Sequence, residues 1–431
     1  MIDSGSLLKI LASKDRQILQ LTRVLNNVYQ SRGWRFVLLI RRLKHFKFEL
    51  TGKRSSSPKI NSNYINQFLE NLKSDKPNLI LINHETTLTG APVVLLDLAN
   101  AIKRKNNFNV SIINVKRRGP DLDGQLSKFN SIDLCDKNNV ELFGIKDFVK
   151  SLYLTDSQAT IIVNTITLNS FTTILKEAGF SFYTWVHELE LSWSIIGVEN
   201  VKTQLSNSKK IVVDSNRIKD QISKFDICKN VDYLENGISF RITSGAMELR
   251  KAYELTELDI AVTIAGSRSI RKGYDLLPYL MRKINEFSLE NGLERKIKVF
   301  WIGELESYEL NFFITKQLFN ETYKNLEVIL LSNVVNYENY VNASNYFISL
   351  AREDSAPQTL FLAQNLNIHN YSLSTVKDSK LDIYGEIDLM AKTIAQSLVS
   401  EFSSNTPIGV YNTWDIYYEK LIKFLGLLPI D

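Results

Sequence analysis

Short apolar runs alternate with segments of helical apolar spacing through most of the chain. The runs are rich in Leu, Ile and Val, as strands buried on both faces would be. The intervening segments have the spacing of helices that bury one side. This alternation predicts an α/β protein with mostly parallel sheets covered by helices on both faces. We expect strands at 78–83, 109–115, 160–164, 181–186, 210–213 and 232–234, and again at 261–266, 298–303, 326–331 and 346–350.

The alternation occurs twice, which predicts two domains of the same kind. The more polar segment 240–258 separates the two series of strands. A chain of 431 residues is also longer than the chains that usually fold around a single hydrophobic core. We expect an extension and linker at 1–75, a first Rossmann-like domain at 76–240, a second at 241–410, and at 411–431 a helix that crosses back to the first domain.

The N-terminal extension has a different pattern. Residues 6–31 have helical apolar spacing, and 53–63 are rich in Ser and Asn, as a linker would be. Between them, residues 32–54 hold eight Lys and Arg against one acid, interleaved with aromatic side chains. Such a cationic amphipathic segment is a candidate for binding an anionic membrane surface. The alternative is a helical extension that packs on the protein or pairs with another chain.

Composition excludes several classes of protein. A net charge of +5 is mild and does not indicate nucleic-acid binding. Cys135 and Cys228 are too few and too far apart for a disulfide framework or a zinc site, and four His argue against a histidine-rich metal centre. No apolar run reaches the ~20 residues that span a bilayer, and the first residues are too polar for a secretory signal. We therefore expect a cytoplasmic protein, at the inner face of the cell membrane if 32–54 binds lipid.

The loop after the first predicted strand is a candidate site. Residues 78–83 lead into HETTLTGAP at 84–92, and helical spacing follows. Pro92 suits the first turn of a helix, because its missing N–H would be unpaired there. A loop of small residues such as this one lets backbone amides approach anionic or hydroxyl groups of a ligand. The GxGxxG and Walker patterns are absent from this loop, which removes support for a nicotinamide or P-loop site.

Residues 83–99 resemble the first strand-loop-helix unit of retaining glycosyltransferases with the GT-B fold. The family pattern SHExxxTGAPxxLxxLA is matched from His84 to Ala99, with Asn83 in place of the leading Ser. The resemblance implies two Rossmann-like domains that face each other across a cleft. The first would hold the acceptor and the second the nucleotide sugar. It also implies acceptor or sugar contacts from the loop residues Thr89, Gly90 and Ala91.

A second match lies where two predicted strands end. One strand ends in Asn164-Thr165, and another delivers TWVHEL, which ends at Leu189. In the resembling family, a histidine in this place lies beside the reacting sugar and helps to hold a sugar hydroxyl. An imidazole suits this role because it donates and accepts hydrogen bonds near neutral pH. The resemblance therefore implies that His187 is catalytic and that Asn164 and Glu188 bind the acceptor or the sugar.

A third match is GSRSIRKG at 266–273, which is similar to the family loop GxxxxRKG. Cations of that loop neutralise the diphosphate of the departing nucleotide, and a fixed cation lowers the barrier as charge develops there. A helix that follows the loop adds its positive N-terminus. Ser267 stands where many relatives carry an Arg, and Arg268 stands next to it, so the motif leaves its first cation unassigned. The implied donor-binding residues are Gly266, Arg268, Arg271, Lys272 and Gly273, with Lys272 also catalytic.

The fourth match is partial and covers 349–363. In the family, two acids stand eight positions apart, one facing the donor sugar and the other accepting hydrogen bonds from the ribose. Pro357 sets the register, so the first acid falls at Asp354, with Glu353 beside it, and the second position is Leu362. The implied site residues here are Glu353 and Asp354 as catalytic acids and Ser355, Ala356 and Pro357 around the donor.

These matches imply a retaining glycosyltransferase that needs neither a metal nor a cofactor, since the nucleotide sugar is a substrate. Its acceptor would be a glycan or a lipid-linked glycan. The residues SRGWR at 31–35 are similar to a segment that precedes the glycosyltransferase domain in multi-domain polysaccharide-assembly enzymes. This similarity suggests a role in cell-surface polysaccharide assembly. Because Leu362 cannot accept a hydrogen bond, a second hypothesis remains: a glycosyltransferase-like partner or glycan-binding subunit without catalysis.

Overall fold

A computed structural model describes residues 62–427, except for 88, 117–121, 137–139, 226, 228–229, 238–244, 321–322, 333, 335, 355–357, 374–382 and 400–412. The expected membrane-binding segment 32–54 and the SRGWR lead-in lie outside the described residues. The donor-binding candidates Ser355, Ala356 and Pro357 also lie outside them.

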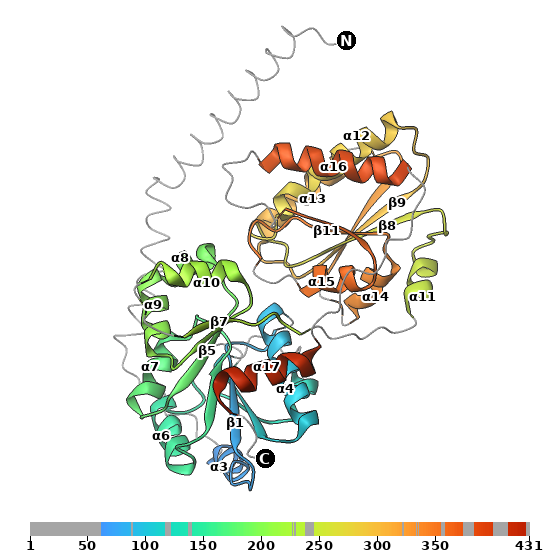
Figure 1. The fold of residues 1–431 in the computed structure, drawn as a ribbon. Helices are drawn as coiled ribbons and strands as arrows, with labels where there is room; N and C mark the ends of the chain where they lie inside the picture. The colour runs from blue at the N-terminus through green and yellow to red at the C-terminus, as the bar shows by residue number, and fades with distance from the viewer. Residues whose placement is uncertain are drawn as a thin grey trace. The chain divides into compact units, whose positions relative to one another are not determined.

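The first domain is built on a parallel sheet of seven strands in the order β3-β2-β1-β4-β5-β6-β7 (Figure 1). Its strands are β1 Asn78–Asn83, β2 Asn109–Asn114, β3 Asn130–Asp133, β4 Thr160–Val163, β5 Phe182–Val186, β6 Ile211–Val213 and β7 Val231–Tyr233. Its helices are α3 Ser62–Glu70, α4 Gly90–Lys105, α5 Asp123–Leu126, α6 Ile145–Thr155, α7 Asn169–Glu177, α8 Glu190–Ile196, α9 Val198–Asn207 and α10 Asn216–Ser223.

The second domain repeats the plan with five parallel strands in the order β10-β9-β8-β11-β12. They are β8 Ile260–Ala265, β9 Ile297–Ile302, β10 Leu326–Leu331, β11 Tyr346–Ser349 and β12 His369–Ser372. The helical elements are α11 Gly245–Ala252, η1 Tyr274–Leu276, α12 Leu277–Glu290, α13 Tyr308–Asn320, α14 Tyr337–Ala343, α15 Gln358–Asn365 and α16 Ile383–Val399. Figure 1 shows α12, α13 and α16 on one face of this sheet and α14 and α15 on the other. The predicted α/β fold with two parallel sheets is confirmed.

Alternate residues of a central strand face opposite layers of helices. In β5, Trp185 belongs to the apolar cluster that includes α4, whereas Val186 packs with α8, α9 and α10. Both faces of the strand are therefore buried, which explains why its sequence reads as one continuous apolar run.

The last helix, α17 (Trp414–Leu425), belongs to the core of the first domain. The Tyr417 ring stacks on Trp185 with centroids 5.2 Å apart, and Arg104 of α4 forms an ion pair with Asp415 at 2.8 Å. Gly237 contacts this helix so closely that a Cβ on it would lie 2.6 Å from Trp414 Cα.

The segment 240–258, which the sequence marks as a connection, contains a helix of the second domain. This helix, α11, is held by Arg250, whose Nη1 donates to Ala343 O at 2.8 Å. The polar composition of the segment reflects surface exposure, since none of the residues in α11 is buried.

Tyr340 makes the stability of the second domain sensitive to alkaline pH. Burial, with the Tyr253 hydroxyl 3.2 Å away, raises the pKa of Tyr340 from 10.0 to about 12. Above pH ~10 the unfolded chain releases this proton while the folded domain keeps it, so stability present below pH ~10 is lost as pH rises through the folded pKa. Urea unfolding of wild type should therefore show a fall in unfolding free energy from pH ~9 to ~11.5 that is smaller in Tyr340→Phe.

The matched control for this prediction is Tyr308→Phe, which makes the same chemical change at a side chain that is 82% exposed. It should leave the pH dependence of the wild type unchanged. An equal loss of stability with pH in the Tyr340→Phe variant and the wild type would contradict the assignment.

Candidate functional site

Polar residues follow the carboxyl ends of four strands in the first sheet. Asn83 ends β1, while Asn164, His187 and Asp214 come directly after β4, β5 and β6. These strands are neighbours in the order β1-β4-β5-β6, so their carboxyl ends meet at one edge. Ligands of open parallel sheets bind at this edge.

His187 lies between two acceptors supplied by neighbouring strands. Its Nδ1 is 2.8 Å from Asp214 Oδ2, and its Nε2 is 2.8 Å from Asn164 Oδ1. Asn164 is oriented in turn by its Nδ2, which donates to Ala91 O at 2.8 Å. Groups of neighbouring strands therefore contact both ring nitrogens of His187. A sugar hydroxyl could bond to Nε2 only if the Asn164 side chain turned away.

Glu188, a predicted sugar-binding residue, holds the strand ends together. Its carboxylate accepts hydrogen bonds from the Thr165 hydroxyl and, at 3.1 Å, from the backbone N–H of His187. Its backbone oxygen accepts from Trp193 Nε1 at 2.8 Å. Glu188 therefore shapes the loop that carries His187.

The loop before α4 folds around a buried carboxylate. Glu85 is 7% exposed, and its Oε1 accepts from Thr87 Oγ1 at 2.9 Å and from Thr89 Oγ1 at 3.3 Å. The Thr89 side chain makes no capping bond to α4. A Cβ on Gly90 would meet no atom within 4 Å, so the first turn of this helix is open on that side. Of the three residues predicted to contact the acceptor or the sugar, Thr89 donates a hydrogen bond to Glu85, and the backbone oxygen of Ala91 accepts one from Asn164. The third, Gly90, is exposed.

The second domain brings two predicted motifs together. Lys272 Nζ lies 2.5 Å from Asp354 Oδ2, although 82 residues separate them in sequence. Their side chains are 17% and 19% exposed. Because β8 and β11 are neighbours, the loops after them meet at the same edge of the sheet. The basic loop and the first acid of the acid segment therefore form one site.

An ion pair that sequence reasoning missed braces these two loops. Arg352 donates from Nη1 and Nη2 to the two carboxylate oxygens of Asp275 at 2.7 and 2.8 Å. Its Nη1 also donates to Ile270 O at 2.6 Å, and its backbone N–H donates to Arg271 O at 3.0 Å. Such a bidentate pair fixes geometry as well as supplying energy. Arg352 thereby positions the basic loop against the acid segment.

Glycines allow these loops to pack at the edge. Gly273 has φ +76°, and a Cβ there would lie 2.1 Å from Leu350 O. A Cβ on Gly303, at the end of β9, would lie 1.9 Å from Gly266 O. Only glycine fits the approaches at Gly273 and Gly303, and the φ of +145° at Gly266 also favours glycine, which accounts for the glycines at both ends of GSRSIRKG.

The three cations of the basic loop have different surroundings. Arg268 is 8% exposed and points into the domain, where its Nε donates to Gly303 O at 3.2 Å and its Nη1 to Asn311 Oδ1 at 3.3 Å. Arg271 is half-buried, and no acid of the described residues forms an ion pair with it. Arg268 thus supports the loop, whereas Lys272 pairs with Asp354 and Arg271 lies half-buried beside it.

The two candidate acids of the acid segment differ in exposure, and the position of the second acid is apolar. Glu353 is only 6% exposed, so Asp354 is the more accessible of the two acids. Helix α15 contains no acid. Leu362 on this helix is 2% exposed and packs in an apolar cluster with Val341, Phe347, Leu360 and Ala363.

Two features are absent from the part of the chain that the structure describes. No three His, Cys, Asp or Glu side chains in it gather as a metal site would require. No helix in it is both long enough and apolar enough to cross a bilayer.

Several solved structures share the fold of this chain. HepE from Anabaena, in complex with UDP-glucose, has a TM-score of 0.60 at 11% identity, with 81% of this chain and 100% of that chain covered. A glycosyltransferase from Rickettsia africae has a TM-score of 0.56 at 13% identity, with 83% of this chain and 100% of that chain covered. The pneumococcal O-GlcNAc transferase GtfA, in complex with UDP and GlcNAc, has a TM-score of 0.56 at 10% identity, with 83% of this chain and 100% of that chain covered.

These structural neighbours are GT-B glycosyltransferases, and the chain shares their fold of two parallel α/β domains. No protein-family model matches the sequence. No curated protein matches it either. At these identities the likeness establishes the fold and not the chemistry.

Proposed function

We propose that the protein is a retaining glycosyltransferase that moves a sugar from a nucleotide sugar to a glycan or lipid-linked acceptor in cell-surface polysaccharide assembly. The observation that carries the proposal is the 2.5 Å contact between Lys272 and Asp354 at the carboxyl edge of the second sheet. It places a cation and an acid together at the edge where such domains bind nucleotides.

In this proposal, Lys272 and Arg271 bind the diphosphate of the donor. Negative charge develops on the leaving phosphate as the glycosidic bond breaks, and fixed cations stabilise it more in the transition state than in the ground state. The Arg352–Asp275 pair holds the loop, so the cations need little reorganisation. Asp354 would then accept hydrogen bonds from hydroxyls of the donor sugar.

The first domain would hold the acceptor. The Asn164–His187–Asp214 chain of hydrogen bonds fixes the imidazole at the edge of the sheet. Retention would follow if the leaving phosphate assists attack from the same face of the sugar, as in the resembling family. No protein nucleophile is then required.

A thermal-shift screen with UDP, GDP, CMP and dTDP sugars tests the proposal. UDP sugars come first, because HepE and GtfA are seen with UDP-glucose and with UDP and GlcNAc. A donor at about 100 times its Kd should stabilise the protein by ~2.7 kcal/mol, which raises Tm by roughly 5–10 °C. The anomeric signal of the product in an NMR spectrum should keep the configuration of the donor.

Failure of every nucleotide sugar to raise Tm, together with no release of nucleotide, would overturn the transferase. The protein would then be a non-catalytic partner or glycan-binding subunit. An inverted product anomer would leave the transferase standing and overturn retention.

We also propose that residues 32–54 bind an anionic membrane reversibly. This segment holds eight Lys and Arg and one acid. Each cation should contribute ~1 kcal/mol to the free energy of binding near a negatively charged surface. In a flotation assay, the full chain should rise with phosphatidylserine vesicles and not with phosphatidylcholine vesicles. Equal flotation with both, or with neither, would contradict the proposal.

A further inference from the structure

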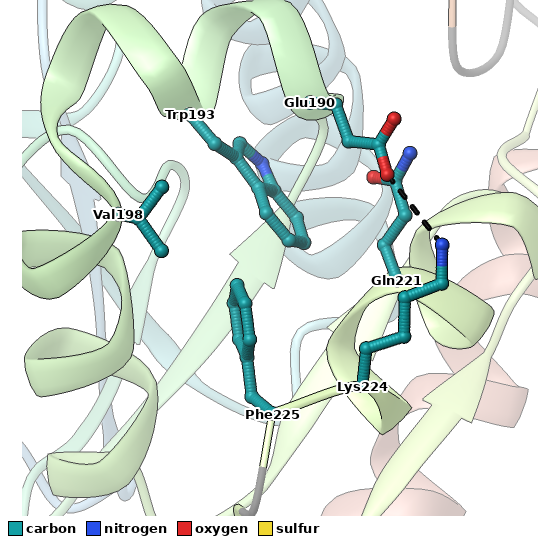
Figure 2. A pocket seen from close by; sticks show the side chains of 6 residues that line it. All are labelled: Glu190, Trp193, Val198, Gln221, Lys224 and Phe225. Carbon is teal, nitrogen blue, oxygen red and sulfur yellow. Dashed lines mark ion pairs between the residues drawn. The ribbon is translucent and has the colours of Figure 1, made fainter.

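The first domain contains a pocket that none of Asn164, His187 and Asp214 lines. It has a volume of about 220 Å³ and is lined by Glu190, Trp193, Val198, Gln221, Lys224 and Phe225 (Figure 2). Helices α8, α9 and α10 supply its walls, with Phe225 just beyond α10. The volume is below the ~300–1,000 Å³ of pockets that hold drug-sized ligands, so it suits a molecule of one ring.

The pocket contains a buried polar group that calls for a ligand. Gln221 is 4% exposed, and its Oε1 has no hydrogen-bond partner among the residues that the structure describes. An apolar ligand would leave that oxygen unsatisfied, which costs free energy in a buried place. A hydroxyl group would satisfy the amide in either orientation, because it both donates and accepts.

The opposite walls are aromatic and apolar. The rings of Trp193 and Phe225 lie 5.4 Å apart at 39°, and Val198 flanks them. Because Trp193 Nε1 donates to Glu188 O at 2.8 Å, the indole is held in place and its polar atom is engaged elsewhere. A ligand therefore needs C–H groups toward these walls and hydroxyls toward Gln221.

The mouth of the pocket adds one acceptor and one donor. Glu190 Oε1 lies 3.6 Å from Lys224 Nζ, and the two side chains are 58% and 70% exposed (Figure 2). An exposed ion pair of this kind contributes little, so its members can turn toward a ligand at small cost. The carboxylate also disfavours an anionic ligand such as a phosphate.

We propose that this pocket binds one pyranose residue of the acceptor glycan. A pyranose has C–H groups on its faces and hydroxyls around its edge, which matches the aromatic walls and the three polar side chains. The tie between Trp193 and Glu188 places the pocket beside the loop that carries His187. The assignment of this sugar as part of an acceptor rests on the proposed transferase function.

The test uses Gln221→Leu in the full chain. Saturation-transfer NMR is recorded with methyl α-D-glucopyranoside, methyl α-D-galactopyranoside and N-acetyl-D-glucosamine as probes. We expect at least one probe to bind wild type, and its affinity to fall about three- to tenfold in Gln221→Leu, the effect of one lost hydrogen bond. The variant should keep the Tm of wild type or exceed it, because it removes an unsatisfied buried oxygen.

Lys224→Met provides a second variant, with Lys219→Met on the same helix as its control. Lys219 faces Asp232 at 3.7 Å and does not line the pocket. Affinity for the probe should fall in Lys224→Met and not in Lys219→Met. Equal affinities in wild type and Gln221→Leu, or no bound probe at all, would overturn the sugar site.

A donor thermal shift on the same samples separates this inference from the proposed function. A donor shift without any bound probe leaves the transferase standing and overturns the pocket. A bound probe that is lost in Gln221→Leu, without a donor shift in wild type, supports the sugar site and overturns the transferase.

Discussion

Replacing Lys272 by Met should lower the rate of sugar transfer at saturating donor by about 10²–10³-fold, the effect of losing one preorganised charge at a transition state. The Lys272 ammonium is in contact with Asp354 and stands next to Arg271 in the loop. It would share its charge with the leaving diphosphate as the glycosidic bond breaks. Transfer should be measured by nucleotide release with donor and acceptor both saturating.

The matched control is Lys298→Met. Lys298 is 15% exposed and pairs with Glu327 at 3.1 Å in the same domain, so it loses a comparable ion pair away from the proposed site. Both variants should melt within a few degrees of wild type, and only Lys272→Met should lose turnover. Wild-type transfer by Lys272→Met, or an equal loss in both variants, would contradict the assignment.

Most of the strands that were predicted from sequence are buried on both faces, although the edge strands β7 and β10 were predicted as well. All six residues of β1 are buried, and burial of this kind selects a continuous apolar run. The two strands missed, β3 and β12, lie at the edges of their sheets. β3 buries one residue of four and β12 is half-buried throughout, so neither sequence, NSID or HNYS, shows an apolar run or a clear alternation.

The sequence shows the candidate motifs separately but not the contacts between them. Lys272 and Asp354 each match a motif, while their contact depends on the adjacency of β8 and β11 in the sheet. Asp214 follows a predicted strand, but the residues around it do not show that the neighbouring strand in the sheet is the one that ends at His187. The Arg352–Asp275 brace joins positions 77 residues apart, and no short pattern contains both.

Side-chain direction was beyond the sequence too. Three cations within five positions read alike as a basic loop. In the structure, the bonds from Arg268 to Gly303 O and Asn311 turn it into the domain and leave the other two nearer the surface. The direction is set by groups that come more than 30 residues later in the chain.

The largest effect on stability is expected for Leu362→Glu, which introduces an acid at the position where the resembling family has its second acid. Leu362 is 2% exposed within an apolar cluster on α15. A carboxylate placed there would lose its hydration without gaining a partner, and stability should fall by several kcal/mol. For a domain of this size, such a loss lowers Tm by roughly 10 °C.

Acid should partly rescue this variant. Burial in an apolar cluster raises the pKa of the introduced Glu above its value in the unfolded chain. Its neutral form is therefore the better tolerated, and stability is lost as pH rises through the folded pKa. The Tm difference from wild type should be smaller at pH ~5 than at pH ~7.5.

Leu362→Met is the conservative control and should cost less than ~1.5 kcal/mol, because volume and polarity are kept. Phe361→Glu tests the neighbouring register, in which Glu353 instead of Asp354 is the first acid of the pair. Phe361 is only half-buried, so an acid there can reach water and should be tolerated better. Tighter donor binding by Phe361→Glu alone would assign the acid pair to Glu353 and position 361.

Donor affinity, measured by calorimetry on the same proteins, distinguishes an active donor site without a second acid from a donor site that has been lost. If wild type binds a nucleotide sugar and Leu362→Glu is destabilised without binding it more tightly, the ribose is held without a second acid. The cations at 271–272 and the backbone of the braced loops then supply more of the affinity than in a site with two acids. A tighter and equally stable Leu362→Glu would instead mean that the cluster around α15 opens toward the ribose. If wild type binds no nucleotide sugar, the buried Leu362 records the loss of the donor site, and the protein is a non-catalytic partner.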